Sequence, residues 1–300
     1  MLKTTVIGSF PVKTDSGYYS RKYLEKKPES PYPKLIRDAV DAQVEAGIDI
    51  VSDGQTRSDF VSLYAKGFSG ILLQERPQVF SKIRCRGPIT VADQEYVKKT
   101  LPEKTMLKGI VTGPYTLAKS CVNHYYDCVE DLAFDFAEGL REEVKALCRT
   151  VDFIQVDEPM MTVEYPDYGR ELISKVFKSA KKPRMLHACG DVSKVFENFI
   201  EFPVDFLEHE FKANPALLDT VSQYDFRQKI GYGCVRSDLE EVETVGEIVG
   251  HVEAGIKKLG IGNIILCPDC GMRNLPPESA GKKLENMVLA KNILEEKWGK

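Results

Sequence analysis

Residues 184–190 read Arg-Met-Leu-His-Ala-Cys-Gly, a short apolar run that ends in polar side chains and a glycine. Similar runs recur along the chain with longer amphipathic stretches between them, a pattern typical of strands alternating with helices. Their content of β-branched residues is typical of strands buried in a parallel sheet. We recognise eight such runs, at residues 4–8, 48–54, 107–113, 153–158, 184–190, 205–210, 230–235 and 263–267.

The stretches between these runs indicate a closed barrel. The clearest amphipathic ones span residues 33–46, 127–148, 168–179, 242–259 and 280–296. Eight strand–helix units in 300 residues fit an α/β fold of the (β/α)8 TIM-barrel type better than an open doubly wound sheet. No glycine-rich dinucleotide fingerprint follows the first run, which disfavours the Rossmann alternative further.

One segment is too long and too rich in Gly and Pro for a single crossover. Residues 61–100 contain Gly67, Gly70, Pro77 and Gly87, among others. We therefore expect an excursion after the second strand, with a hairpin, over the barrel mouth. No linker-like or low-complexity stretch divides the chain, so we expect residues 1–300 to form a single catalytic TIM-barrel domain.

Composition excludes several classes of protein. The formal net charge of −4 argues against a nucleic-acid partner. No run of about 18 apolar residues occurs, so we expect no membrane span. The first residues lack the apolar stretch of a signal peptide, and we therefore expect a cytoplasmic protein. Its eight cysteines are then expected to be reduced, most of them buried and a minority available for metal.

In a barrel of this type the active site gathers at the carboxyl ends of the strands. Nearly every predicted strand delivers a polar or metal-binding group there, which random surface polarity would rarely produce. The side chains at these ends are those of Ser9, Asp53, Gln55, Asp59, Thr112, Asp157, Glu158, His187, Cys189, Glu210 and Cys270.

Four of these residues form a plausible zinc shell. Two thiolates, an imidazole and a carboxylate, from Cys189, Cys270, His187 and Glu210, are donors that borderline-soft Zn²⁺ accepts together. The i, i+2 spacing of His187 and Cys189 points both side chains to one side of a strand. The same spacing makes Glu208 a rival to Glu210.

The neighbours of these candidates have simpler interpretations. His209 is expected on the opposite face from Glu210, and Cys267 of the Cys-x-x-Cys sequence is expected in the core.

A zinc shell rich in thiolates is a poor activator of water and suits the ionisation of a substrate thiol. Alkyl transfer to a thiol is therefore the predicted chemistry, and metal-assisted hydrolysis is its competitor.

Several motifs, in order, resemble the C-terminal catalytic barrel of cobalamin-independent methionine synthase. The resemblance covers essentially the whole chain and resides in residues 5–11 (Thr-Val-Ile-Gly-Ser-Phe-Pro), 87–91 (Gly-Pro-Ile-Thr-Val), 112–116 (Thr-Gly-Pro-Tyr-Thr), 154–159 (Ile-Gln-Val-Asp-Glu-Pro), 187–189 (His-Ala-Cys) and 268–271 (Pro-Asp-Cys-Gly).

The resemblance implies roles for individual residues. It implies zinc ligation by His187, Cys189, Glu210 and Cys270, the same four residues that the chemistry selected, with Glu210 loosening when the substrate sulfur arrives. It implies that homocysteine lies against Ile7, Gly8 and Ser9, with Asp157 and the adjacent Glu158 at its ammonium end. The place of a second ammonium-binding carboxylate is taken by Gln55, which brings no charge.

Departures from the family pattern concern the methyl donor. The family's full-length enzyme has a second, N-terminal barrel, whereas we expect these 300 residues to form one barrel. The place of the tryptophan that stacks on the folate ring falls near Ser120, and Trp298 is the only tryptophan. The family's catalytic histidine aligns with Asp238, close to Arg236. Because a methylcobamide releases a Co(I) species that needs no proton, these losses favour a corrinoid donor. We expect a methyl-corrinoid protein to carry it. Short, single-barrel members of archaea and some bacteria look like enzymes of that type.

Three alternatives remain open at this stage. The acceptor could be another thiol such as coenzyme M, although a sulfonate would favour Arg or Lys where Ser9 and Asp157 stand. A tetrapyrrole decarboxylase built on a related barrel would need no metal. A non-catalytic zinc-binding protein would have a closed site.

Overall fold

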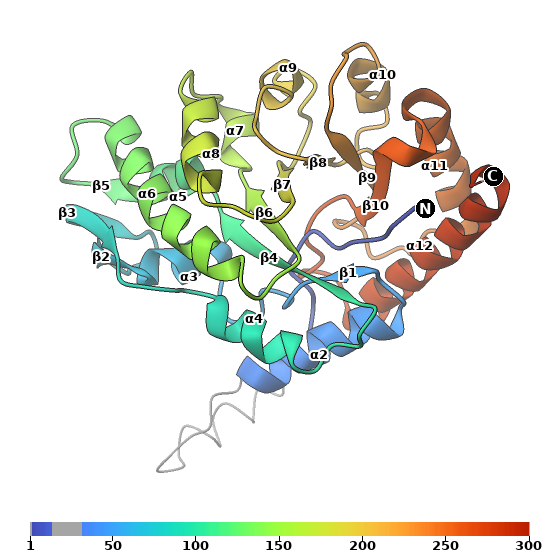
Figure 1. Cartoon of the computed structure of the whole chain (residues 1–300), viewed down its shortest axis with the longest axis horizontal. Coiled ribbons are helices and arrows are strands. Elements are labelled where there is room, and N and C mark those ends of the chain that lie inside the picture. Colours follow the sequence, from blue (N-terminus) through green and yellow to red (C-terminus); the bar gives the residue numbers. More distant parts are fainter. Residues whose placement is uncertain (1, 14–31, 300) are drawn as a thin grey trace.

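Parallel strands form the centre of the computed structural model, which describes residues 2–13 and 32–299 (Figure 1). One curled sheet has seven strands in the order β1-β4-β6-β7-β8-β9-β10, and all of its pairings are parallel. The strands are β1 (Ile50–Val51), β4 (Met106–Thr112), β6 (Phe153–Asp157), β7 (Arg184–His187), β8 (Phe206–His209), β9 (Lys229–Val235) and β10 (Ile264–Pro268).

The amino-terminal segment occupies the eighth position of the barrel. Thr4 pairs with Leu266 of β10 and Thr5 pairs with Ile50 of β1, both in parallel. The Thr5 amide donates to the Leu266 carbonyl at 2.8 Å, and the Ile50 amide donates to the Thr4 carbonyl at 3.0 Å. These two bridges join the edges of the sheet, so the TIM-barrel prediction and its eight strand positions are confirmed.

Helices surround the sheet and cover the apolar outer faces of its strands (Figure 1). The predicted amphipathic stretches correspond to α2, α6, α8, α11 and α12, with ends within a few residues of those expected. In the described part of the chain, the helices outside residues 60–100 are α2 (Tyr32–Glu45), α5 (Pro114–Ser120), α6 (Val129–Leu147), α7 (Met160–Val163), α8 (Gly169–Phe177), α9 (Phe196–Phe199), α10 (Leu217–Val221), α11 (Val245–Leu259), a 3-10 turn (Ile261–Asn263) and α12 (Pro277–Trp298).

The excursion after the second strand exists and contains the predicted hairpin. It consists of α3 (Phe60–Lys66), the antiparallel strands β2 (Phe68–Leu72) and β3 (Gln78–Cys85), and α4 (Val91–Lys98). The hairpin pairs with β5 (Val122–Asn123), and its Phe68 ring meets Phe136 of α6 edge to face at 4.9 Å. It therefore packs against α6, while α3 brings Phe60 to the barrel mouth.

Two Gly-Pro-x-Thr sequences are held by buried glutamates. Glu143 of α6 accepts hydrogen bonds from the Ile89 amide at 2.7 Å and from the Thr90 amide and hydroxyl at 2.8 and 2.7 Å. Glu158, after β6, holds the amides of Tyr115 and Thr116 and the Thr116 hydroxyl in the same way. Two of the motifs that carry the family resemblance are thus fixed by a carboxylate at the start of a helix: Glu158 satisfies free amides in the first turn of α5, whereas Glu143 holds the two amides that precede α4.

A buried ion pair lies inside the barrel. Lys108 of β4 and Glu208 of β8 are both fully buried, and Nζ lies 3.1 Å from Oε1. Charges buried in this way must be paired, so Glu208 is committed to Lys108. Among the residues that the structure describes, no helix is long and apolar enough to cross a membrane.

Candidate metal and acceptor site

Three predicted ligands converge at the carboxyl end of the barrel. His187 ends β7, Cys189 follows two residues later, and Cys270 lies just after β10. Their donor atoms all lie within 4.8 Å of one another. His187 Nε2 is 3.0 Å from Cys189 Sγ, which is 3.0 Å from Cys270 Sγ. A disulfide would need about 2.05 Å, so both cysteines are free thiols.

The imidazole of His187 is oriented for ligation through Nε2. Its Nδ1 lies 3.1 Å from the backbone carbonyl of Glu208, which can only accept a hydrogen bond. Nδ1 therefore keeps a proton, and it is Nε2, facing the two sulfurs, that becomes free to ligate when the ring is neutral. A hydrogen bond of this kind fixes the tautomer of metal-binding histidines.

The charges of the cluster are strongly coupled. The hydrogen bond from Cys189 lowers the pKa of the Cys270 thiol, and giving that bond raises the pKa of Cys189. Burial is the largest single influence and lowers the pKa of His187, but the charge and hydrogen bond of Cys270, together with the charges of Asp157 and Glu208, raise the pKa to about 9. Without metal the cluster therefore holds one thiolate, one thiol and an imidazolium at neutral pH. This cluster favours binding of a metal cation, because the cation can displace the protons of the thiol and of the imidazolium.

Of the two rival carboxylates, Glu210 is the one near the cluster with its charge uncommitted. It is half-buried after β8, and its carboxylate accepts a hydrogen bond from the Gly190 amide, next to Cys189. Burial raises its pKa, and the charge of Cys270 adds to the effect. Glu208 carries the buried pair with Lys108 instead.

A residue that the sequence analysis did not select holds the Glu210 loop. The Asp269 carboxylate accepts the amides of Lys212 at 2.9 Å and Ala213 at 2.7 Å. Asp269 precedes Cys270, so one short loop both carries a sulfur donor and fixes the loop after β8. Burial raises the pKa of Asp269 to about 7. Its position inside the Pro-Asp-Cys-Gly motif was the only sequence signal for this role.

The same loop contacts the amino-terminal segment. The Met272 amide donates to the Ser9 carbonyl at 2.7 Å, and a Cβ at Gly271 would collide with the Ser9 hydroxyl. A larger residue at position 271 would displace this hydroxyl, so the glycine lets Ser9 keep its place beside Cys270.

A cavity of about 120 Å³ opens beside the cluster. It contains seven of the predicted site residues together with Phe60, Pro159 and Gly271, which the sequence analysis did not single out. Its wall is formed by Ile7, Ser9, Gln55, Phe60, Asp157, Pro159, His187, Cys189, Cys270 and Gly271. The predicted convergence of strand ends on one small site is therefore observed, although the roles assigned to these residues stay predictions.

Asp157 supplies a carboxylate to this wall. Its Oδ1 accepts a hydrogen bond from Gln155 Nε2 at 2.6 Å, and the same Nε2 lies 2.7 Å from the Ile7 carbonyl. Burial raises the pKa of Asp157 to about 6, although the positive charge of His187 opposes the rise. Gln155 was missed by the sequence analysis, yet it precedes Asp157 by two residues and so shares its face of β6.

Four predicted site residues lie outside the cavity wall, and one of them is Glu210, which is also outside the three-donor cluster. Gly8 does not line the cavity, and a Cβ added to Gly8 itself would collide with the side chains of Gln55 and Ile110. Asp238 is exposed and pairs with Arg236, Nε to Oδ1 at 2.7 Å. Glu158 faces away from the cavity and toward the start of α5, where a Cβ at Gly113 would collide with its carboxylate.

A structural role for Glu158 predicts a large loss of stability on truncation. Glu158→Ala removes the acceptor of two amides and one hydroxyl in the protein interior, so we expect the free energy of unfolding to fall by about 2–4 kcal/mol. Denaturant unfolding measures this change. Glu164→Ala, an exposed partner of Lys119, is the matched control and should cost under about 1 kcal/mol. Equal stability of the two variants would contradict the role.

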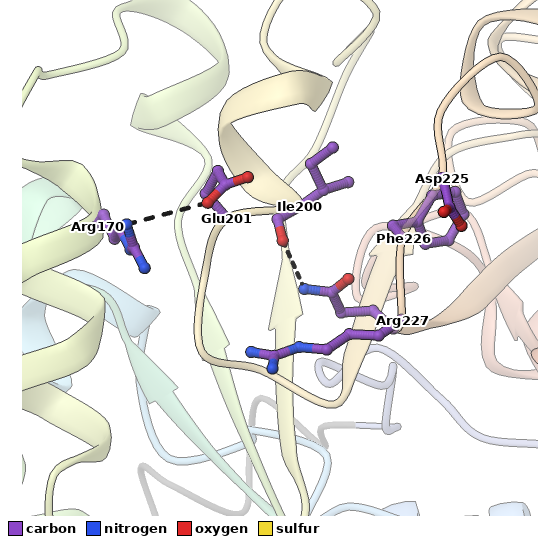
Figure 2. Close-up of a pocket in the computed structure, with 7 residues that line it drawn as sticks. Arg170, Ile200, Glu201, Asp225, Phe226 and Arg227 are labelled. Atoms are coloured by element: carbon purple, nitrogen blue, oxygen red, sulfur yellow. Dashed lines mark hydrogen bonds and ion pairs between the residues drawn. The ribbon is translucent and has the colours of Figure 1, made fainter.

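A larger cavity, of about 520 Å³, holds none of the predicted residues (Figure 2). It is lined by Arg170 of α8, by the chain around Ile200 and by residues 225–228. Gln228 Nε2 donates to the Ile200 carbonyl at 2.8 Å, and Arg170 lies 3.9 Å from Glu201. These contacts connect exposed loops and offer no nucleophile or metal donor set. The smaller cavity is therefore the functional candidate.

Comparison with known proteins agrees with this arrangement. A family model described as the catalytic domain of cobalamin-independent synthase matches residues 2–292. The chain belongs to this family. The protein is accordingly an enzyme, a methyltransferase.

Relatives in the same family match over their whole lengths. The methionine synthase of Methanocaldococcus jannaschii is 35% identical over 312 residues, which cover 97% of this chain and 99% of that protein. The methionine synthase of Methanothermobacter marburgensis is 35% identical, with 96% and 98% covered. A B12-independent methionine synthase from Shewanella, solved in complex with selenomethionine, superposes with a TM-score of 0.82 at 23% identity, covering 99% of this chain and 98% of that one. This last likeness supports the barrel fold.

Proposed function

We propose that the protein makes methionine by transferring a methyl group from a methylcobamide to homocysteine, with Zn²⁺ held by His187, Cys189, Glu210 and Cys270. The observation that carries the proposal is the convergence of an imidazole and two thiols on a small cavity whose wall includes a carboxylate, Asp157. The archaeal relatives named methionine synthase support homocysteine as the acceptor.

The donor set suits zinc. Two sulfurs and one imidazole nitrogen within 4.8 Å match the ligand types and the compactness of a zinc site, and Glu210 stands next to Cys189 through its bond to Gly190. When bound there, zinc supplies the positive charge that keeps an acceptor thiol ionised at neutral pH. Glu210, the least enclosed of the four, is the ligand suited to yield its place.

The cavity wall suits an amino acid acceptor. The Asp157 carboxylate is held by Gln155 and has the charge to bind an ammonium group, while Ser9 and the Ile7 backbone flank it. Gln55 offers an amide oxygen on the same wall. A sulfonate acceptor such as coenzyme M would meet the Asp157 charge unfavourably, which favours homocysteine over that alternative.

The environments of Asp238 and Trp298 support a corrinoid donor. Arg236 lowers the pKa of Asp238, so this carboxylate is ionised at neutral pH and is unsuited to protonate a leaving folate amine. Trp298 ends α12, with its indole Nε1 3.4 Å from Glu253, and it does not line the cavity. With a methylcobamide the sulfur–carbon bond forms as the cobalt–carbon bond breaks, and both electrons remain on cobalt as Co(I). No proton is required.

A direct comparison of donors tests this proposal. Zinc-loaded protein is incubated with homocysteine and either methylcobalamin or methyltetrahydrofolate, and methionine is quantified. We expect turnover with methylcobalamin and none with the folate. Turnover with the folate alone would refute the corrinoid donor, and turnover only with another thiol would refute the acceptor. We further propose that a methyl-corrinoid protein is the partner and that residues 1–300 act as one catalytic domain.

A further inference from the structure

The loop that carries Cys270 reaches a second wall of the cavity through Arg273. The Arg273 guanidinium donates through Nη2 to the carbonyl of Gln55 and, at 3.0 Å, to the carbonyl of Ser58. Both acceptors lie between β1 and α3, more than two hundred residues away in the sequence. Arginine is suited to this contact because its planar group presents several donors in a fixed geometry.

Gln55 has a backbone conformation that needs such support. Its φ of 47° is in the left-handed region, and it is the one non-glycine residue with a positive φ in the described part of the chain. Side chains other than glycine are strained there unless neighbouring contacts hold them. The Asp53 carboxylate accepts the Gln55 amide at 3.0 Å, and Arg273 binds the Gln55 carbonyl. Gln55 is thus held on both sides of its Cα.

The held segment contributes two side chains to the cavity. Gln55 begins it, and Phe60 follows as the first residue of α3, which Asp59 caps by accepting the Ser62 amide at 2.8 Å. The Phe60 carbonyl is fixed by the Thr112 hydroxyl, also at 2.8 Å. Arg273 connects this segment to the loop that carries Cys270. The position of Gln55 relative to Cys270 therefore depends on the contacts of Arg273 with the carbonyls of Gln55 and Ser58.

We propose that Arg273 is a positioning residue that sets the acceptor-binding wall, Gln55 and Phe60, against the sulfur site. This inference rests on the proposed function, because it assigns the wall to the acceptor amino acid. Arg273 acts through the backbone of residues 55–58 and does not itself touch the acceptor. Its loss shifts the wall but leaves His187, Cys189 and Cys270 in place.

Steady-state kinetics and zinc content of the zinc-loaded full chain test the inference. Arg273→Gln should raise KM for homocysteine by about tenfold or more, since hydrogen bonds to a charged group are lost, while kcat changes far less and zinc stays at the wild-type content. Arg273→Lys, which restores one donor, should recover part of the loss. Arg76→Gln is the matched control, because Arg76 also donates to backbone carbonyls, those of Lys119, Ser120 and Cys121, and should leave KM unchanged.

A double-mutant cycle separates positioning from a general structural effect. If Arg273 acts through Gln55, the rise in KM caused by Arg273→Gln should be smaller in a Gln55→Ala background than in the wild type. An unchanged KM in Arg273→Gln, additive effects in the cycle, or loss of zinc with Arg273→Lys would each overturn the inference. Absence of homocysteine turnover by the wild-type protein would instead refute the proposed function.

Discussion

Cys270→Ser is expected to abolish zinc binding and methyl transfer together. Cys270 Sγ lies 3.0 Å from Cys189 Sγ and at the cavity wall, so it is central to the donor set. A serine hydroxyl is a far weaker zinc ligand than a thiolate. Because changes in residues that only support a ligand already cost about 10–100-fold in metal affinity or activity, loss of the ligand itself should exceed 100-fold.

Metal analysis after dialysis and methionine formation measure the two losses. Cys267→Ala is the matched control, because Cys267 belongs to the same Cys-x-x-Cys sequence but is fully buried in β10 and outside the donor cluster. That variant should keep its zinc. Full zinc content and activity in Cys270→Ser would contradict the assignment of Cys270 as a ligand.

The same zinc site should show a marked pH dependence in the wild-type protein. Without metal, His187 has a raised pKa of about 9 and is protonated at pH 7, and the cysteine pair holds one further proton. Ligation requires a neutral imidazole and two thiolates, so about two protons should leave on binding. Zinc affinity should therefore fall as the pH falls below 9. Calorimetry in buffers of different ionisation enthalpy counts the protons, and release of none would contradict this description.

Much of the fold and of the cluster follows from local sequence. Strand positions were readable because buried parallel strands are short apolar runs, and strand ends in a barrel meet at one face. The pairing of His187 with Cys189 followed from a spacing of two residues. The residues that hold the site were not readable in this way, because their partners are distant. Arg273 binds the Gln55 loop, and Asp269 binds the Lys212 loop.

Two ambiguities show where sequence periodicity is sufficient and where it is not. Asp157 and Glu158 are adjacent at the end of β6, and they point to opposite sides, one to the cavity and the other to α5. The alternation of side chains along a strand is sufficient to predict that Asp157 and Glu158 face different sides. Glu208 and Glu210 share a face, and what distinguishes them is the buried pair between Glu208 and Lys108, which is one hundred positions away. Only tertiary structure supplies that partner.

Asp157→Asn is expected to raise KM for homocysteine by about 10–100-fold, with a smaller effect on kcat. The substitution keeps the shape and an oxygen that can accept the 2.6 Å hydrogen bond from Gln155, but it removes the charge that would bind the acceptor ammonium. A hydrogen bond to a charged group is worth about 1.5–3 kcal/mol, which corresponds to this change in KM. Initial rates over a range of homocysteine concentrations measure it, and Asp219→Asn, at an exposed position of α10, is the control.

Moving the carboxylate from position 157 to position 55 tests whether its charge binds the acceptor. Gln55 stands on the same cavity wall as Asp157, so Gln55→Glu would place a carboxylate on that wall without changing the length of the side chain. Combined with Asp157→Asn, it should recover part of the lost affinity for homocysteine, while zinc content stays constant in all four proteins. If the charge of Asp157 binds the ammonium, the benefit of Gln55→Glu should be larger in the Asp157→Asn background than in the wild type. If neither substitution changes KM for homocysteine, the acceptor ammonium binds elsewhere.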